Sequence, residues 1–276
     1  MRLKNTVTAV GALVLLAASS LWAQQGVLSL AQSAAKAKQI IAETIQALGG
    51  KAYLDAGDQT CTGQVASFGF HNQVLNYRSV EDYKLFPDKE RSEYYQKRNI
   101  INVYNGKQGW TLDRAGVSDL PAADIADFQA GLDRDMNFLF RFRLHDPGLT
   151  FQYDGSDVVD LKQVYWVQVT NTHNLTTKIA VSQFSHLPVQ ALYINRDPVT
   201  DELSQETEYF SNYQDVQGIE TPYQDSRFRN GQKIFQFFIS SCQYNTGLKP
   251  DFFTKQSLEE RWAKLGGKKK KKRHLF

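Results

Sequence analysis

The 276-residue chain contains 42% hydrophobic and 12% aromatic residues, including 17 Phe and 13 Tyr, which excludes a disordered polar chain. Its formal net charge is +3, but Arg2 and Lys4 supply two positive charges and the run Lys268–Arg273 supplies six, which leaves a mildly acidic body. Because these basic residues form a terminal tail without interleaved aromatic residues, we expect no nucleic-acid partner.

The N-terminus has the order of a secretory signal peptide. Arg2 and Lys4 precede an apolar stretch over residues 7–18, and small residues follow up to Ala23. We expect residues 1–23 to be a signal peptide that is cleaved after Ala23, which makes the protein periplasmic. A retained anchor is the alternative, but the apolar run of about a dozen residues is shorter than the roughly 20 that a spanning helix needs.

The first half of the remaining chain predicts one helix followed by strands. Residues 28–48 carry apolar side chains three or four positions apart, which is amphipathic helical spacing, and Gly49-Gly50 ends the helix. Between residues 59 and 112, runs rich in Thr, Val, Phe and Tyr alternate with turn residues and predict four or five antiparallel strands. Asn105-Gly106 is the strongest hairpin signal, because both residues tolerate positive φ.

The second half repeats this order. Residues 122–144 return to helical spacing, as one long helix or two short ones. Residues 149–244 predict about six more strands, and residues 257–265 predict a short final helix. The turn signals that delimit these strands are Asp154-Gly155, residues 172–174, residues 185–188, residues 196–198, residues 215–218 and Asn230-Gly231.

This order of elements predicts an α+β, mainly β fold. We expect one curled antiparallel sheet of about 10–11 strands, an incomplete barrel, with helices covering its concave face. Short connections favour antiparallel pairing, because parallel strands need crossovers of about a dozen residues or more. We expect residues 24–267 to form a single domain and residues 268–276 to be a basic disordered tail.

Cys61 and Cys242 are the two cysteines of the chain. In an oxidising periplasm such a pair can form a disulfide. Two free buried thiols are the alternative, since the sequence does not show whether the two Cα atoms lie within the roughly 7 Å that a disulfide requires.

The sequence shows no pattern of catalytic or metal-binding residues. It lacks a Gly-x-Ser-x-Gly elbow, a Ser-x-x-Lys motif and a glycine-rich phosphate loop, and no two histidines have metal-ligand spacing. We therefore expect no metal, no cofactor and no enzymatic activity. The isolated histidines are His71, His145, His173, His186 and His274.

Apolar and aromatic residues are numerous for a curled sheet that only three helical segments cover. An ordinary filled core is the simpler interpretation, because aromatic side chains dominate protein cores. The alternative is an apolar cavity between helices and sheet that holds a lipid or acyl chain. The residues that we expect to line this cavity are Phe68, Phe70, Trp110, Met136, Phe140, Trp166, Phe210, Phe235 and Phe237.

Several stretches, in order along the chain, resemble one known family. Residues 37–63 contain the end of the predicted helix, which closes with Ala-Leu-Gly-Gly, and then lead to Thr-Gly at the first predicted strand. Residues 104–110 have the sequence Tyr-Asn-Gly-Lys-Gln-Gly-Trp of the predicted hairpin. With residues 213–223 and 245–252 as closing strands, the chain resembles the periplasmic outer-membrane lipoprotein-sorting (Lol-type carrier) superfamily. The resemblance implies an incomplete antiparallel barrel plugged by helices, and a carrier that binds and releases acyl chains without covalent chemistry.

These observations lead to three hypotheses of function. The first is a periplasmic carrier that holds a lipid or lipoprotein acyl chain between sheet and helices, with a transient contact between Lys268–Arg273 and an anionic membrane surface. The second is an envelope interaction module with a filled core. The third is an unrecognised hydrolase. A cavity of roughly 300 Å³ or more that is lined by the named aromatic residues favours the first hypothesis. A closed interior with an exposed apolar patch of several hundred Å² favours the second, and convergent His, Ser and Asp in a cleft favour the third.

Overall fold

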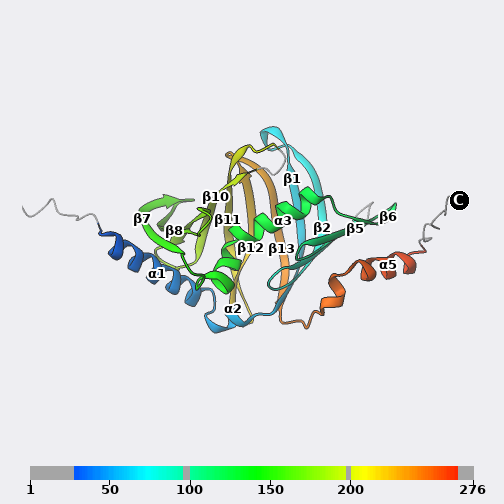
Figure 1. Cartoon of the computed structure of the whole chain (residues 1–276), viewed down its shortest axis with the longest axis horizontal. Coiled ribbons are helices and arrows are strands. Elements are labelled where there is room, and N and C mark those ends of the chain that lie inside the picture. Colours follow the sequence, from blue (N-terminus) through cyan, green and yellow to red (C-terminus); the bar gives the residue numbers. More distant parts are fainter. Residues whose placement is uncertain (1–27, 96–99, 197–199, 267–276) are drawn as a thin grey trace, which may run out of the picture.

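The computed structural model describes residues 28–95, 100–196 and 200–266 (Figure 1). The predicted signal peptide and basic tail lie outside these residues. The described chain forms one 13-stranded antiparallel sheet in the order β6-β5-β4-β3-β2-β1-β13-β12-β11-β10-β9-β8-β7. The strands are β1 Asp58–Phe68, β2 Val74–Leu85, β3 Lys89–Tyr95, β4 Ile100–Asn105, β5 Gln108–Asp113, β6 Gly116–Asp119, β7 Thr150–Val159, β8 Lys162–Thr170, β9 Thr176–Ser182, β10 Pro188–Arg196, β11 Leu203–Val216, β12 Ile219–Arg229 and β13 Gln232–Tyr244.

The sheet confirms the predicted fold class, since it is antiparallel throughout, curled and not closed into a barrel. It has more strands than the expected 10–11, because β6 adds an edge strand and residues 149–244 hold seven strands rather than six. The turn predicted at Asp154-Gly155 is wrong. These residues lie inside β7, where the pairing with β8 shifts between Tyr153 and Ser156, so the ladder absorbs them as an irregularity.

The helices of the structure are α1 Leu30–Ala47, α2 Lys51–Asp55, α3 Ala122–Arg134, α4 Met136–Phe138 and α5 Lys255–Lys264, with a π-helical turn η2 at Leu139–Arg143 and short turns η1 at Phe70–Asn72 and η3 at Pro250–Phe253. Ser29 and Gln32 start α1 with a reciprocal capping box. The predicted helix over residues 122–144 is broken at Asp135, which adopts an extended conformation with φ −61° and ψ 126°.

Each helix covers a different part of the sheet (Figure 1). Helix α1 packs on β7 and β8, α3 crosses the middle strands, and α5 packs on β5 and β6 at the other end. The main hydrophobic core joins α1 and the α4–η2 segment to the sheet, and a smaller core lies under α5 around Val103, Phe253 and Leu258. Within the described ranges, no helix combines the length and apolar character that crossing a bilayer requires.

The two ends of the sheet region meet where β1 pairs with β13. Cys61 lies opposite Cys242 in this ladder, their Cα atoms are 4.1 Å apart, and the structure joins them in a disulfide. Adjacent strands bring opposite residues this close only at a fixed register, which the sequence does not reveal. The disulfide therefore fastens together the two halves of the sheet, which are 181 residues apart at this point.

Candidate functional site

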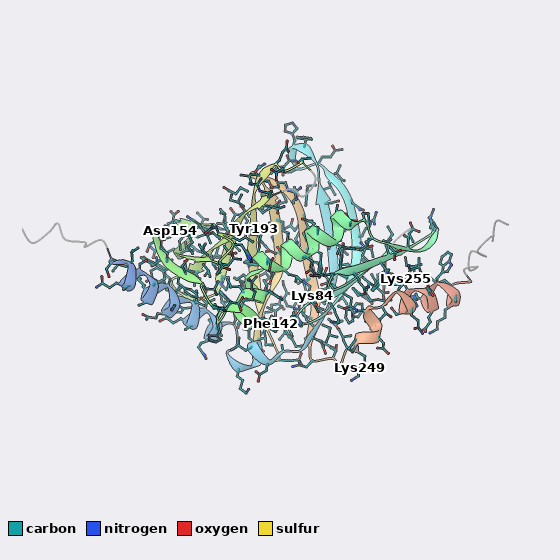
Figure 2. All side chains as sticks on the ribbon, in the orientation of Figure 1. Lys84, Phe142, Asp154, Tyr193, Lys249 and Lys255 are labelled. Carbon is teal, nitrogen blue, oxygen red and sulfur yellow. A yellow bond between two sulfur atoms is a disulfide. The ribbon has the colours of Figure 1, made fainter. Side chains whose placement is uncertain are left out.

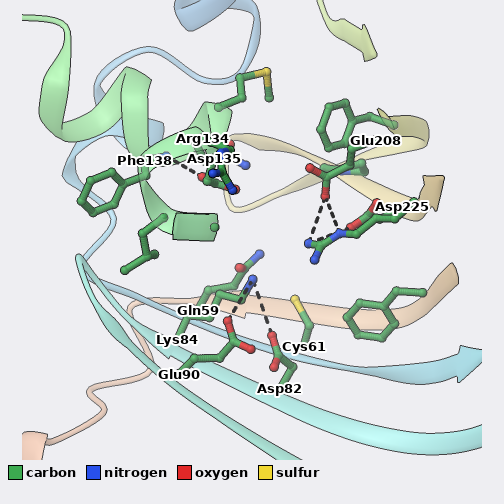
Figure 3. A pocket seen from close by; sticks show the side chains of 18 of the residues that line it. Gln59, Cys61, Asp82, Lys84, Glu90, Arg134, Asp135, Phe138, Glu208 and Asp225 are labelled. Atoms are coloured by element: carbon green, nitrogen blue, oxygen red, sulfur yellow. Dashed lines mark hydrogen bonds and ion pairs between the residues drawn. The ribbon is translucent and has the colours of Figure 1, made fainter. Parts of the chain in front are cut away.

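A cavity of about 640 Å³ lies between the middle of the sheet and the helical segment of residues 122–143. Strands β1, β2, β3, β11, β12 and β13 form its floor, and α3, α4 and η2 form its roof. Figure 3 shows Arg134, Asp135 and Phe138 on the roof, facing Lys84 and Glu208 on the sheet. The cavity is in the size range of pockets that bind small ligands, about 300–1,000 Å³.

One part of the cavity wall is aromatic. Helix α2 contributes Tyr53, whose hydroxyl donates to Oδ1 of Asn137 at 2.9 Å. The guanidinium of Arg141 lies between the rings of Tyr53 and Phe86, 4.3 Å and 4.4 Å from their centroids. The other apolar side chains of this wall are Met136, Phe138, Phe142, Phe210, Tyr213, Phe237, Ile239 and Tyr244. These rings offer an apolar surface on both the roof and the floor.

The structure places the predicted cavity residues in three kinds of environment. Met136, Phe210, Phe235 and Phe237 line the cavity. Phe140 is buried in the main core without lining the cavity. The remaining four lie elsewhere: Phe68 at the end of β1, Phe70 exposed in the turn after it, Trp110 in the core under α5, and Trp166 beside a small cluster on β8.

The floor of the cavity also carries charged side chains from β2 and β3. Lys84 Nζ lies 3.8 Å from carboxylate oxygens of both Asp82 and Glu90. Burial raises the pKa of Glu90, and the neighbouring Asp82 carboxylate adds to this effect. Figure 2 shows Lys84 in the middle of the molecule near Phe142, far from Asp154 and Lys255 at its two ends.

A second charged group comes from β11 and β12. Nη2 of Arg227 lies 3.1 Å from Glu208 and 3.7 Å from Asp225. Burial and the Glu208 carboxylate hold the pKa of Asp225 well above its ordinary value. Burial is the largest influence on Glu208 and would raise its pKa, but the Arg227 charge, a hydrogen bond with Asp225 and the Lys84 charge together outweigh burial, so the pKa of Glu208 is lowered. Beside them, Arg229 pairs with Glu206 at 2.5 Å.

The roof contributes a further carboxyl group at the helix break. Oδ1 of Asp135 accepts a hydrogen bond from the backbone N–H of Phe138 at 2.6 Å, which caps α4. Burial raises the pKa of Asp135, and Glu208 adds to this from across the cavity. The adjacent Arg134 is buried and donates through Nη1 to Asn195, while its Nε has no hydrogen-bond partner.

These charged residues were not predicted to line a site, although the sequence contains a signal for them. They stand two apart on single strands: Asp82 and Lys84 on β2, and Asp225 and Arg227 on β12. A period of two places them on one face of the sheet. Alternation alone does not say which face is inside, and charged residues are most often solvated. Among the described residues, no group of His, Cys, Asp and Glu is arranged to hold a metal ion.

Comparisons with known proteins show similarity of fold rather than of sequence. No family model matches the chain, and a search of curated proteins also found no match. A DUF1329 family protein from Desulfovibrio piger has a TM-score of 0.56 at 17% identity, over 80% of this chain and 98% of that one.

Two further solved structures are similar to this chain in fold. A putative outer membrane lipoprotein-sorting protein domain from Vibrio parahaemolyticus has a TM-score of 0.53 at 14% identity, over 81% of this chain and 99% of that one. A LolA superfamily protein from Nitrosomonas europaea has a TM-score of 0.51 at 13% identity, over 80% of this chain and 99% of that one. The chain therefore has the fold of the Lol-type lipoprotein-sorting superfamily, as its sequence resemblance predicted.

Proposed function

We propose that the protein is a periplasmic binding or carrier protein that holds a lipid or an acyl chain in the cavity beneath α3 and α4. The observation that carries this proposal is the cavity of about 640 Å³ with aromatic side chains on two walls. It exceeds the threshold of roughly 300 Å³ expected for an acyl chain. The likeness in fold to lipoprotein-sorting proteins supports a binding role without covalent chemistry.

Burial of apolar surface supplies the affinity in this proposal. Each Å² of acyl chain that leaves water contributes about 25 cal/mol, and the rings of Phe210, Tyr213 and Phe237 offer surface for such contact. The roof of the cavity is a short helical segment with a break at Asp135. Because this segment is helical, it takes no part in the strand pairing of the sheet. Binding and release then need no change in the ladders.

The test uses an uncharged fluorescent acyl probe and a variant that fills the cavity. Phe237 lines the cavity, so Phe237→Trp adds volume there, whereas Phe184→Trp changes a side chain that is 96% exposed. We expect the native protein and Phe184→Trp to bind the probe equally, and Phe237→Trp to bind it about tenfold more weakly. Absence of probe binding to the native protein, or equal binding by all three proteins, contradicts the proposal.

A docking role in the cell envelope is the second candidate. The turn between β1 and β2 exposes Phe70, Val74 and Leu75, whose exposed fractions are 80%, 56% and 64%. Apolar side chains gathered at an exposed turn are typical of an interaction site. If docking is the main role, Phe70→Ser with Leu75→Ser removes association with isolated envelope fractions and leaves probe binding unchanged.

A further inference from the structure

The charges around the cavity form one interacting set with an excess of carboxyl groups. Lys84 on β2 and Arg227 on β12 each contact two carboxylates, and both also act on Asp135 across the cavity. Opposite charges that share a water-poor space interact more strongly than exposed pairs do. The set contains five carboxyl groups and two cationic groups, namely Asp82, Glu90, Asp135, Glu208 and Asp225 with Lys84 and Arg227.

Three of the five carboxyl groups favour their protonated form. Glu90, Asp135 and Asp225 all have pKa values raised by burial, followed by a neighbouring carboxylate as the next cause. Oδ1 of Asp225 is buried and accepts no hydrogen bond. A buried carboxylate oxygen without a donor costs free energy unless it gains a proton or a cationic partner.

We propose that the cavity recognises an amphiphile with a cationic head group, such as an amine, which lies between Asp135 on the roof and Asp225 and Glu208 on the sheet. The proposal rests on the proposed function, because it assigns the head group of the molecule whose apolar part contacts the aromatic wall. The described positions fit this arrangement, since the carboxyl groups and the rings of Phe210 and Phe237 line the same cavity.

An anionic head group fits the same cavity less well. Lys84 and Arg227 already have two carboxylate partners each, within 3.8 Å and 3.7 Å respectively, so an anion would have to displace them. It would also meet the unpaired oxygen of Asp225. Nε of Arg134 and Nε of Arg141 are buried without hydrogen-bond partners and remain available as donors, and neutral ester or amide oxygens of the ligand satisfy them without adding negative charge.

Carboxyl groups outnumber cationic groups over the whole lining of the cavity, nine against six, the cationic residues being Lys84, Lys89, Arg134, Arg141, Arg227 and Arg229. Asp124 and Asp127 on α3 line the cavity and are exposed, and Glu220 on β12 adds a third carboxylate. Carboxylates that line the approach to a cleft attract cations and raise their rate of association. This excess of carboxyl groups favours a positively charged ligand.

The test compares three amphiphiles with the same dodecyl tail: dodecyltrimethylammonium, dodecyl maltoside and dodecanoate, each below its micelle concentration. At pH 8 we expect charge attraction to make the native protein bind the cationic amphiphile about tenfold more tightly than the neutral one, and dodecanoate most weakly. Equal affinity for the cationic and neutral amphiphiles overturns the head-group proposal and leaves the carrier function standing. Binding of none of the three overturns the carrier function itself.

The pH dependence separates electrostatic recognition from apolar binding. Dodecyltrimethylammonium keeps its charge at every pH, so a change in its affinity reports on the protein. Carboxyl groups with raised pKa values gain protons as the pH falls, and its advantage over dodecyl maltoside should shrink between pH 8 and pH 5. An advantage that does not change with pH contradicts the proposal. The titratable and charged groups that line the cavity are Tyr53, Asp82, Lys84, Lys89, Glu90, Tyr104, Asp124, Asp127, Arg134, Asp135, Arg141, Tyr193, Glu206, Glu208, Tyr213, Glu220, Asp225, Arg227, Arg229 and Tyr244.

Single substitutions test which carboxyl groups cause the preference for the cationic amphiphile. Asp225→Asn and Asp135→Asn keep the size of each side chain and remove its charge, while Glu259→Gln makes the same kind of change on the exposed face of α5. We expect each cavity variant to lose most of the preference for the cationic amphiphile and to bind dodecyl maltoside as the native protein does. If the Glu259→Gln control loses the preference to the same extent, or the cavity variants keep it, the proposal is wrong.

Discussion

Asp58 and Asp225 are both largely buried aspartates, yet their surroundings act on them in opposite directions. Asp58 accepts four hydrogen bonds, from N and Oγ1 of Thr246 and from the backbone N–H groups of Gly247 and Leu248, at 2.7–3.1 Å. Burial alone would raise its pKa, but these donors outweigh burial and hold the pKa below its ordinary value. Asp225 lacks such donors, and its pKa is raised. The hydrogen-bond donors around Asp58 therefore stabilise its charged form, whereas Oδ1 of Asp225 has no such donor and its protonated form is favoured.

At the scale of this residue we predict that Asp58→Asn destabilises the protein. The amide keeps one acceptor oxygen but places an NH₂ group against backbone donors, so the free energy of unfolding should fall by about 2–4 kcal/mol. Urea denaturation at pH 7 measures the change, with Glu259→Gln as the control. An unchanged midpoint for Asp58→Asn would show that the four hydrogen bonds contribute little.

The same carboxylate predicts a direction for acid denaturation. Because the folded-state pKa of Asp58 is lowered, its stabilising contribution is fully present above the unfolded pKa of about 3.9 and is lost as the pH falls through the folded-state value. The difference in stability between the native protein and Asp58→Asn should therefore shrink below about pH 4. Urea midpoints measured from pH 7 to pH 2 test this.

At the scale of elements, the β1–β13 ladder decides how the two halves of the chain are held together. Each half is a meander of neighbouring strands, which local turns can organise without the other half. Among the strand pairings of the described residues, the one between β1 and β13 joins strands that are far apart in sequence, and the Cys61–Cys242 disulfide lies in this ladder. The cavity floor spans the same junction, with β1, β2 and β3 on one side and β11, β12 and β13 on the other.

We predict that the double variant Cys61→Ala with Cys242→Ala lowers the free energy of unfolding by about 2–4 kcal/mol, because the unfolded chain loses a long closed loop. The reductant serves as the matched control: it should lower the urea midpoint of the native protein and leave that of the double variant unchanged. If reductant leaves the native midpoint where it is, the disulfide does not stabilise the fold.

At the scale of the whole molecule, a periplasmic carrier requires export. Residues 1–23 lie outside the described residues, so this proposal rests on Arg2, Lys4, the apolar stretch and Ala23. A disulfide within the sheet agrees with an oxidising compartment.

Export predicts a defined product in a Gram-negative host. The native chain should be found in the periplasmic fraction with Gln24 at its N-terminus, as intact-mass measurement would show. Ala23→Phe removes the small residue at the cleavage site, and we expect it to accumulate as the uncut precursor. Recovery of the native chain from the cytoplasm, or uncut in the membrane, contradicts the prediction.

The sequence by itself determined the fold class of this protein, because strand and helix periodicity and turn residues act locally. Asn105-Gly106 and Asn230-Gly231 mark real turns, whereas Asp160 and Leu161 turn the chain after β7 without a glycine signal. The sequence allowed one long helix or two short ones over residues 122–144, but it did not place the break at Asp135, because the apolar spacing continues through it.

Only the tertiary structure decided which residues line the cavity. Aromatic residues are common to any core, so composition did not separate Phe210 and Phe237, which line the cavity, from Trp110 and Trp166, which do not. The charged residues of the cavity were not predicted for a different reason. The alternation of side chains along β2, β11 and β12 shows which of them share a face of the sheet, but it does not show what packs against that face. That depends on the curl of the sheet and on the helical segment of residues 122–143, which brings Asp135 over Glu208 and Asp225.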